Sequence, residues 1–302
     1  MKFGHVSLVG RPNAGKSTLV NRLVGTKIAI VSDKPQTTRN RILGVRNYPD
    51  AQVVFLDTPG IHRPLHRMNA RMVDVAVDTM EDVDVLGLVM DASEPIGKGN
   101  RFVIDLVTAA KAPVFLILNK IDLMKKSRLL PIIAGYAGLA DFAEIVPVSA
   151  ATGDNVDRLE RTIIDRLPEG EARYPDDYLT DQPERFFASE IVREKLLQFT
   201  HTEIPFSSAV IVERFEEPAP GGDRKAAILN LYCSIIVERE SQKPIVIGKG
   251  GDMIKRIGSA ARQELERFFG MRVYLELHVR VKAEWREDDR MLGEFGVGPR
   301  DT

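Results

Sequence analysis

An octapeptide near the N-terminus decides the fold class of this 302-residue chain. Gly10-Arg11-Pro12-Asn13-Ala14-Gly15-Lys16-Ser17 follows the apolar run 6–9 and precedes a stretch of helical length. A glycine-rich turn between a strand and a helix lets backbone N–H groups surround phosphate oxygens, and the helix dipole directs its positive end at them. We expect Lys16 to reach the terminal phosphates and Ser17 to bind Mg²⁺. In this context a glycine-rich turn without a ligand is the weaker alternative.

The rest of the first half alternates apolar runs with mixed-polarity stretches. Further runs lie at 53–56, 83–90, 113–118 and 145–148. Apolar runs without alternation are typical of parallel strands that are buried on both faces of a sheet. The pattern predicts a P-loop NTPase fold, a doubly wound α/β domain with a mostly parallel sheet and ligands at the carboxyl ends of its strands.

The string Asn119-Lys120-Ile121-Asp122 predicts a preference for guanine. It closes the strand at 113–118, so Asn119 and Asp122 can face one base. A carboxylate accepts two N–H bonds from guanine, and adenine offers no such donor pair. The stem of Lys120 can lie along the base. Taken alone, the string could also be a helix-starting turn capped by Asp122.

Three further strings complete the predicted site. Asp57-Thr58-Pro59-Gly60 ends the run at 53–56, which brings a carboxylate to the Mg²⁺ and the Gly60 N–H to the terminal phosphate. Thr38, within Gln36-Thr37-Thr38-Arg39, can complete the metal shell, although an ordinary polar loop is an open alternative here. The Ser149-Ala150 pair can direct backbone N–H groups at the guanine carbonyl.

The predicted nucleotide-binding residues are Gly10, Arg11, Pro12, Asn13, Ala14, Gly15, Lys16, Ser17, Thr18, Asp57, Thr58, Pro59, Gly60, Ile61, Asn119, Lys120, Asp122, Ser149 and Ala150. The predicted metal ligands are Ser17, Thr38 and Asp57. The residues predicted to contribute to hydrolysis are Asn13, Lys16, Thr38 and Gly60.

In order, the strings GRPNAGKS, QTTR, DTPG, NKID and SA resemble the nucleotide-binding motifs of the Era, TrmE and Der group of translation-factor-like GTPases. The resemblance covers about residues 5–168 and implies GTP hydrolysis with Mg²⁺. Small GTPases carry a water-orienting glutamine where this chain has Ile61, which cannot polarise water. The resemblance implies that a K⁺ ion bound through the Asn13 oxygen supplies the missing charge, with a merely turn-stabilising Asn13 as the alternative.

The second half predicts a separate domain. The segment around 168–177 is polar and proline-bearing, so we assign 1–172 to the GTPase domain, 173–182 to a linker and 183–302 to a second domain with a tail. Its predicted order is helix, strand, strand, helix and strand, and Gly248-Lys249-Gly250-Gly251 opens the second helix. The final strand, 272–282, alternates strictly.

The turn at 248–251 predicts RNA binding. Five basic residues and one acid lie between 243 and 262 of a chain whose net charge is −1. Such a turn clamps about four single-stranded nucleotides, although a solvated basic helix face is the alternative reading. The predicted RNA-binding residues are Ile247, Gly248, Lys249, Gly250, Gly251, Lys255 and Arg256.

This region resembles the type II KH domain at the C-terminus of Era-like GTPases. The resemblance implies that GTP and GDP control binding to 16S rRNA near its 3′ end during assembly of the small (30S) ribosomal subunit, with no role for DNA. The alternative is an RNA-binding assembly factor with a structural nucleotide and negligible turnover.

We expect a cytoplasmic monomer that also visits the membrane surface as a peripheral protein. The first apolar run begins too early for a signal peptide, and no run of 18 apolar residues exists. In the tail, Trp285 is expected to anchor the chain to the second domain, with base stacking on RNA as the alternative.

Overall fold

A computed structural model describes the chain except residues 35, 202, 219–226, 296 and 298–302. Contacts divide it into two compact units, one of residues 1–181 with Val297 and one of residues 182–296. The unit boundary therefore lies at the end of the predicted linker, and the last five residues of the predicted second domain fall outside the description. Among the described residues, no helix has both the length and the apolarity needed to span a bilayer.

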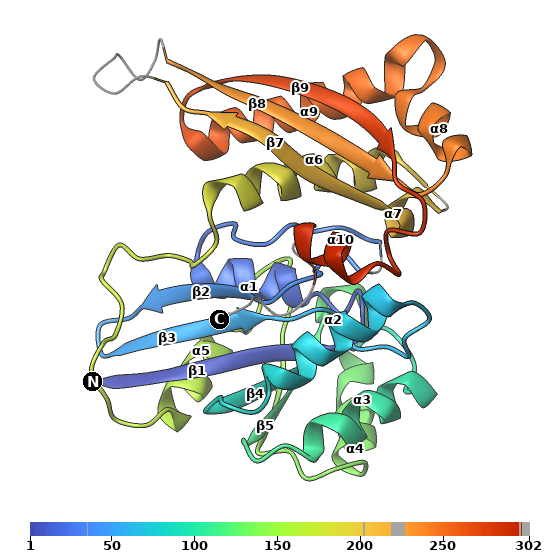
Figure 1. The fold of residues 1–302 in the computed structure, drawn as a ribbon. Coiled ribbons are helices and arrows are strands. Elements are labelled where there is room, and N and C mark those ends of the chain that lie inside the picture. The colour runs from blue at the N-terminus through green and yellow to red at the C-terminus, as the bar shows by residue number, and fades with distance from the viewer. Residues whose placement is uncertain (35, 202, 219–226, 296, 298–302) are drawn as a thin grey trace. The chain divides into compact units, whose positions relative to one another are not determined.

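The first unit contains a six-stranded sheet in the order β2-β3-β1-β4-β5-β6. All neighbouring strands are parallel except the β2–β3 pair, which forms an antiparallel edge (Figure 1). The strands are β1 (Lys2–Gly10), β2 (Ile42–Asn47), β3 (Ala51–Asp57), β4 (Val85–Asp91), β5 (Val114–Asn119) and β6 (Glu144–Pro147). The predicted doubly wound, mostly parallel sheet is thus confirmed.

Apolar strands form here because both faces of the sheet are covered. Leu86 and Leu88 of β4 lie in the core under α2, α3 and α4, while Val85 and Val89 point the other way and are equally buried. The helices are α1 (Lys16–Val24), α2 (Arg67–Asp78), α3 (Lys98–Thr108), α4 (Leu129–Ala137) and α5 (Val156–Arg166). This layering leaves the loops at the carboxyl edge to form the site.

The predicted linker packs against the first unit. Gln52 of β3 accepts hydrogen bonds at Oε1 from the backbone N–H groups of Arg173 (2.8 Å) and Tyr174 (3.0 Å), and its amide donates to Tyr174 O. The rings of Tyr174 and Tyr178 pack against the apolar cluster at β2 and β3. Residues 173–181 of the predicted linker are therefore part of the GTPase unit.

The second unit has a three-stranded sheet in the order β7-β8-β9, with β7–β8 antiparallel and β8–β9 parallel (Figure 1). Its elements are α6 (Glu184–Phe199), α7 (Ile204–Ser207), β7 (Ser208–Glu216), β8 (Ile228–Val237), α8 (Lys243–Ile247), α9 (Asp252–Phe269), β9 (Arg272–Val281) and α10 (Asp289–Glu294). The short helices α7 and α8 were not predicted, because four or five residues are too few to show a helical period.

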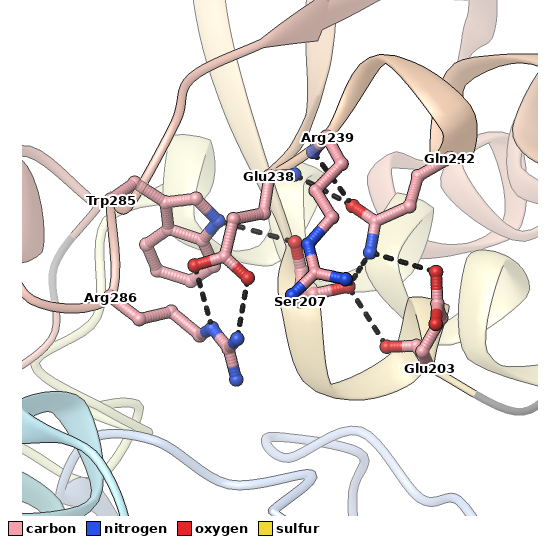
Figure 2. Close-up of polar contacts among 7 residues, drawn as sticks. All are labelled: Glu203, Ser207, Glu238, Arg239, Gln242, Trp285 and Arg286. Atoms are coloured by element: carbon pink, nitrogen blue, oxygen red, sulfur yellow. Dashed lines mark hydrogen bonds and ion pairs between the residues drawn. The ribbon is translucent and has the colours of Figure 1, made fainter.

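Trp285 anchors the tail to this second unit, as predicted. Its side chain is fully buried, and its indole N–H donates to Ser207 O at 3.2 Å. Figure 2 shows the neighbouring pair, in which the Arg286 guanidinium makes two hydrogen bonds to the Glu238 carboxylate. Gln242 bonds Ser207 and the backbone N–H of Glu238 in the same network. Full burial excludes the alternative that Trp285 stacks on RNA bases.

Candidate functional site

The predicted nucleotide residues meet at the carboxyl edge of the six-stranded sheet. Part of the set lines a cavity of about 420 Å³, and Asn119, Asp122, Ser149 and Ala150 lie outside its wall. Of the predicted set, its wall contains Pro12, Asn13, Gly15, Lys16, Ser17, Thr18, Thr38, Gly60 and Lys120. The segment Ile30–Asp33, which sequence reasoning missed, lines the same cavity together with Gln36, Thr37 and Glu94.

Three glycines allow the loops to approach closely. Gly10 and Gly15 have φ values of 151° and 91°, and a Cβ on Gly15 would lie 2.2 Å from the Asn119 amide nitrogen. A Cβ on Gly60 would lie 2.7 Å from the backbone nitrogen of Pro12. The phosphate loop, the base-binding loop and the 57–60 loop can therefore touch only because these positions lack side chains.

Lys16 is held inside the phosphate loop by backbone oxygens. Its ammonium donates to Gly10 O (3.3 Å) and Arg11 O (3.1 Å), and only 6% of the residue is exposed. Burial lowers the pKa of Lys16 to about 8, although the nearby Asp57 carboxylate opposes this shift. The loop thus buries a cation whose charged form an anionic ligand would stabilise.

Hydroxyl and carboxylate oxygens converge next to Lys16 as a Mg²⁺ site requires. Ser17 Oγ donates to Asp57 Oδ2 at 2.7 Å and lies 2.8 Å from Thr38 Oγ1. Asp57 is fully buried, its Oδ1 has no hydrogen-bond partner among the described residues, and burial raises its pKa. A buried carboxylate oxygen of this kind, among hard oxygen donors, fits Mg²⁺, so the three predicted metal ligands form a coherent set.

The base-binding residues are preassembled on the neighbouring strands. The Asn119 amide donates to Ala14 O and its Oδ1 accepts the Ala150 N–H, both at 2.9 Å. Ser149 Oγ donates to Asp122 Oδ1 at 2.6 Å. These contacts bring the phosphate loop, the 119–122 string and the 149–150 pair together.

Two residues that sequence reasoning missed support this region. Asp91, at the end of β4, forms an ion pair with the Lys120 ammonium at 2.6 Å. Arg22, in α1, donates to two backbone oxygens of the loop after Ser149. Neither residue belongs to a recognisable string, so only its position in the fold links it to the site.

Three predicted nucleotide-binding residues have other roles in this structure. The Ile61 side chain is buried in the core under α2–α4, and its N–H donates to Gly10 O. Thr58 is fully buried and donates to Leu8 O. The Arg11 guanidinium turns toward Asn100 Oδ1 (3.0 Å). Their side chains shape the loops rather than line the cavity.

Asn13 lies where the phosphate loop meets the segment after α1. It has a φ of 62°, and its amide donates to Asp33 O at 2.7 Å. That bond uses the amide nitrogen, and the acceptor oxygen of Asn13 takes no part in it. The contact joins the phosphate loop to the segment after α1.

In the second unit, the turn at 248–251 exposes its backbone. Gly248, Gly250 and Gly251 have φ values of 77°, 61° and 83°, which favour glycine. A Cβ on Gly250 or Gly251 would meet no described atom within 4 Å, whereas one on Gly248 would lie 2.7 Å from Met253 N. Packing within the unit therefore explains Gly248 only, and the open space above the other two suits a close-lying nucleotide backbone.

The basic side chains near this turn differ in their contacts with the rest of the unit. Lys249 and Lys255 are exposed. The Arg256 guanidinium lies 4.9 Å from the centre of the Phe199 ring, which ties it to α6. We expect Lys255→Ala to reduce the salt dependence of RNA binding by about one ion, and Arg256→Ala to reduce stability as well.

The shifted Lys16 pKa predicts proton uptake on nucleotide binding. In the free protein the pKa of about 8 leaves half of the lysines neutral at pH 8, and bound phosphates restore the charge. GDP binding at pH 8 without Mg²⁺ should therefore take up about half a proton, and affinity should fall as the pH rises above 8. Calorimetry in buffers of different ionisation enthalpy measures this uptake. Lys16→Arg stays charged, so equal uptake by this variant would contradict the assignment.

Comparison with known proteins agrees with both units. A family model described as a 50S ribosome-binding GTPase matches residues 5–120, and a KH domain model matches residues 223–286. GTPase Era of Geobacter metallireducens is 50% identical over 98% of this chain and 97% of its own length, and that of Geotalea uraniireducens is 52% identical over the same shares.

Two solved structures cover 99% of this chain and all of their own at 42% identity. One is Aquifex aeolicus Era bound to GDP and aluminium fluoride, with a TM-score of 0.93. The other is Era in complex with MgGDPNP and nucleotides 1506–1542 of 16S ribosomal RNA, with a TM-score of 0.94. With a GTPase model matching one unit, a KH domain model matching the other and full-length relatives at this level of identity, the chain belongs to the Era family of GTPases.

Proposed function

We propose that this GTPase acts in the maturation of the small ribosomal subunit by binding 16S rRNA near its 3′ end through its KH domain. Bound GTP would order the loops around Thr38 and Gly60, and the GTP and GDP states would differ in how the protein engages the RNA. The relative solved with nucleotides 1506–1542 of 16S rRNA supports this choice of RNA.

One observation carries the proposal. A Cβ on Gly250 or Gly251 would enter open space at the start of α9, whose first eleven residues carry three basic side chains and one acid, and the same chain contains the nucleotide cavity. A surface that accepts a nucleotide backbone serves no purpose for GTP hydrolysis alone. The alternative of a purely structural nucleotide is not retained, because the family is one of GTPases.

Crosslinking in cells followed by sequencing tests the RNA target. We expect crosslinks through residues 248–251 at the 3′ end of 16S rRNA in small-subunit particles. Depletion of the protein should then leave 16S precursors with unprocessed 3′ ends. Crosslinks confined to other RNAs, with normal 3′ ends after depletion, would overturn the proposal.

We propose Mg²⁺ as the resident metal and K⁺ as the source of the missing charge in hydrolysis. Ser17, Thr38 and Asp57 would hold Mg²⁺, which would neutralise the phosphate oxygens. Ile61 contributes no polar group to hydrolysis, so the positive charge must come from another source. A monovalent ion near the Asn13 oxygen would supply it. Catalysis would then combine Lys16, Mg²⁺, K⁺ and the Gly60 backbone.

GTP turnover should therefore be faster in K⁺ than in Na⁺. Asn13→Ala should remove this difference with little change in nucleotide affinity, because the Asn13 oxygen would contact the ion and not the nucleotide. Asn13→Asp keeps an oxygen at the same place and should retain the preference for K⁺. Steady-state rates in matched chloride salts, with and without RNA, decide the question. Equal wild-type rates in the two salts would leave Asn13 with only its bond to Asp33.

We further propose that the protein works as a cytoplasmic monomer with peripheral visits to the membrane, and not on DNA. These points rest on the resemblance to Era-like proteins rather than on a feature of the site. Light scattering of the purified protein and fractionation of cells test them directly.

A further inference from the structure

Arg22 connects the helix that follows the phosphate loop to the loop that reads the base. Its guanidinium donates from Nε to Ala150 O and from Nη2 to Ala151 O, each at 2.6 Å, across 128 and 129 residues of sequence. Hydrogen bonds from a charged, planar fork to two successive carbonyls fix both distance and orientation. Arg22 is therefore placed to hold the Ser149–Gly153 loop against α1.

The loop is shaped to receive this side chain. Gly153 has a φ of 90°, and a Cβ there would lie 2.7 Å from Arg22 Nη1. Within the loop, the Gly153 N–H donates to Ser149 O and the Ser149 N–H donates to Asp154 O. The loop thus folds on itself, and Gly153, which has no side chain, faces the guanidinium.

These bonds close a ring around the nucleotide site. The Ala150 N–H donates to Asn119 Oδ1, and the Asn119 amide donates to Ala14 O. Ala14 belongs to the phosphate loop, which leads directly into α1 and so back to Arg22. The ring links the phosphate-binding and base-binding ends of the site, and Arg22 contributes to it from outside the nucleotide motifs.

We propose that Arg22 is a positioning residue that sets the affinity for guanine nucleotides. It holds the Ser149–Ala150 backbone against Asn119, whose side chain accepts the Ala150 N–H, and it keeps Ser149 beside Asp122. Within the described part of the chain, the residues that line the cavity do not include Arg22. Its loss therefore weakens binding of the base and leaves the chemistry at the terminal phosphate intact.

The test compares nucleotide affinity with turnover in the full-length protein. Arg22→Ala should raise the Kd for fluorescent GDP by about tenfold, mainly through faster release, because two charge-assisted hydrogen bonds are lost at an exposed site. The kcat at saturating GTP should stay within about twofold, since that step does not use the loop. The Kd of Arg22→Lys should lie between those of the wild type and of Arg22→Ala, because the lysine ammonium can reach one carbonyl but lacks the planar fork.

Two further variants separate positioning from a general loss of structure. Arg158→Ala removes the same charge from an exposed position of α5 and should leave the Kd unchanged. Gly153→Ala should weaken GDP binding in both backgrounds, because alanine is strained at a φ of 90°, and the added conflict with Arg22 Nη1 exists only where Arg22 is present. The thermal midpoint of every variant is measured alongside.

An unchanged Kd and release rate for Arg22→Ala would overturn the proposal. So would a parallel fall of kcat and affinity, because it would indicate that α1 and the phosphate loop themselves are disturbed.

Discussion

Asp122→Asn is expected to convert this GTPase into an enzyme that prefers xanthosine nucleotides. Ser149 Oγ donates to Asp122 Oδ1 at 2.6 Å, so the oxygen of an asparagine would keep this bond and its amide N–H₂ would face the base. That amide repels the guanine amino group and donates to the second carbonyl of xanthine. Sites built around a specific hydrogen-bond pattern reject the mismatched ligand by large factors, so GTP affinity should fall on the order of a thousandfold.

Competition of GTP and XTP against fluorescent GDP or XDP measures this change. Asp122→Ala should lose GTP without gaining XTP, because it supplies neither acceptor nor donor. Asp154→Asn removes an exposed carboxylate from the segment between β6 and α5 and serves as the charge control. If Asp122→Asn kept the wild-type preference for GTP over XTP, Asp122 would not be the residue that reads the base.

Replacing Lys249 and Gly250 together by Asp is expected to abolish RNA binding by the KH domain. The change removes one positive charge and places two carboxylates where phosphates must lie, which should weaken binding by several kcal/mol, or about a thousandfold. The domain should still fold. Gly250 has a φ of 61°, which aspartate tolerates better than most residues, and its Cβ would enter open space.

Fluorescence anisotropy with a single-stranded RNA from the 3′ end of 16S rRNA provides the readout at two salt concentrations. GTP affinity should not change, because both substitutions lie in the second compact unit. Arg267→Asp places a similar change near the C-terminal end of α9 and should weaken binding far less. Equal losses in the two variants would show that net charge, rather than the turn, governs binding.

The local patterns predicted the fold with few errors. The apolar runs of the first half became buried parallel strands, and the alternation at 272–282 placed Val273, Leu275, Leu277, Val279 and Val281 of β9 toward one core. The edge strand β2 and the short helices α7 and α8 were missed. Their sequences carry too few periodic residues, and β2 forms only because β3 pairs with it.

The sequence alone determined which chemical groups serve the nucleotide. The phosphate loop is contiguous, so its glycines, Lys16 and Ser17 have their roles wherever a strand precedes and a helix follows. The same holds for the turn at 248–251, because a glycine-rich turn opening a basic helix is defined within a few residues. Such motifs are readable because the residues that act together are neighbours in the chain.

Only the tertiary structure decided how these groups support one another. Arg22 meets Ala150 across 128 residues, and Gln52 bonds Tyr174 across 122, which makes the predicted linker part of the GTPase unit. The fold also buries Ile61 in the core. These contacts depend on which strands lie side by side and on which face each residue occupies. Local sequence does not encode such pairings, because they arise from packing the whole sheet and its helices at once.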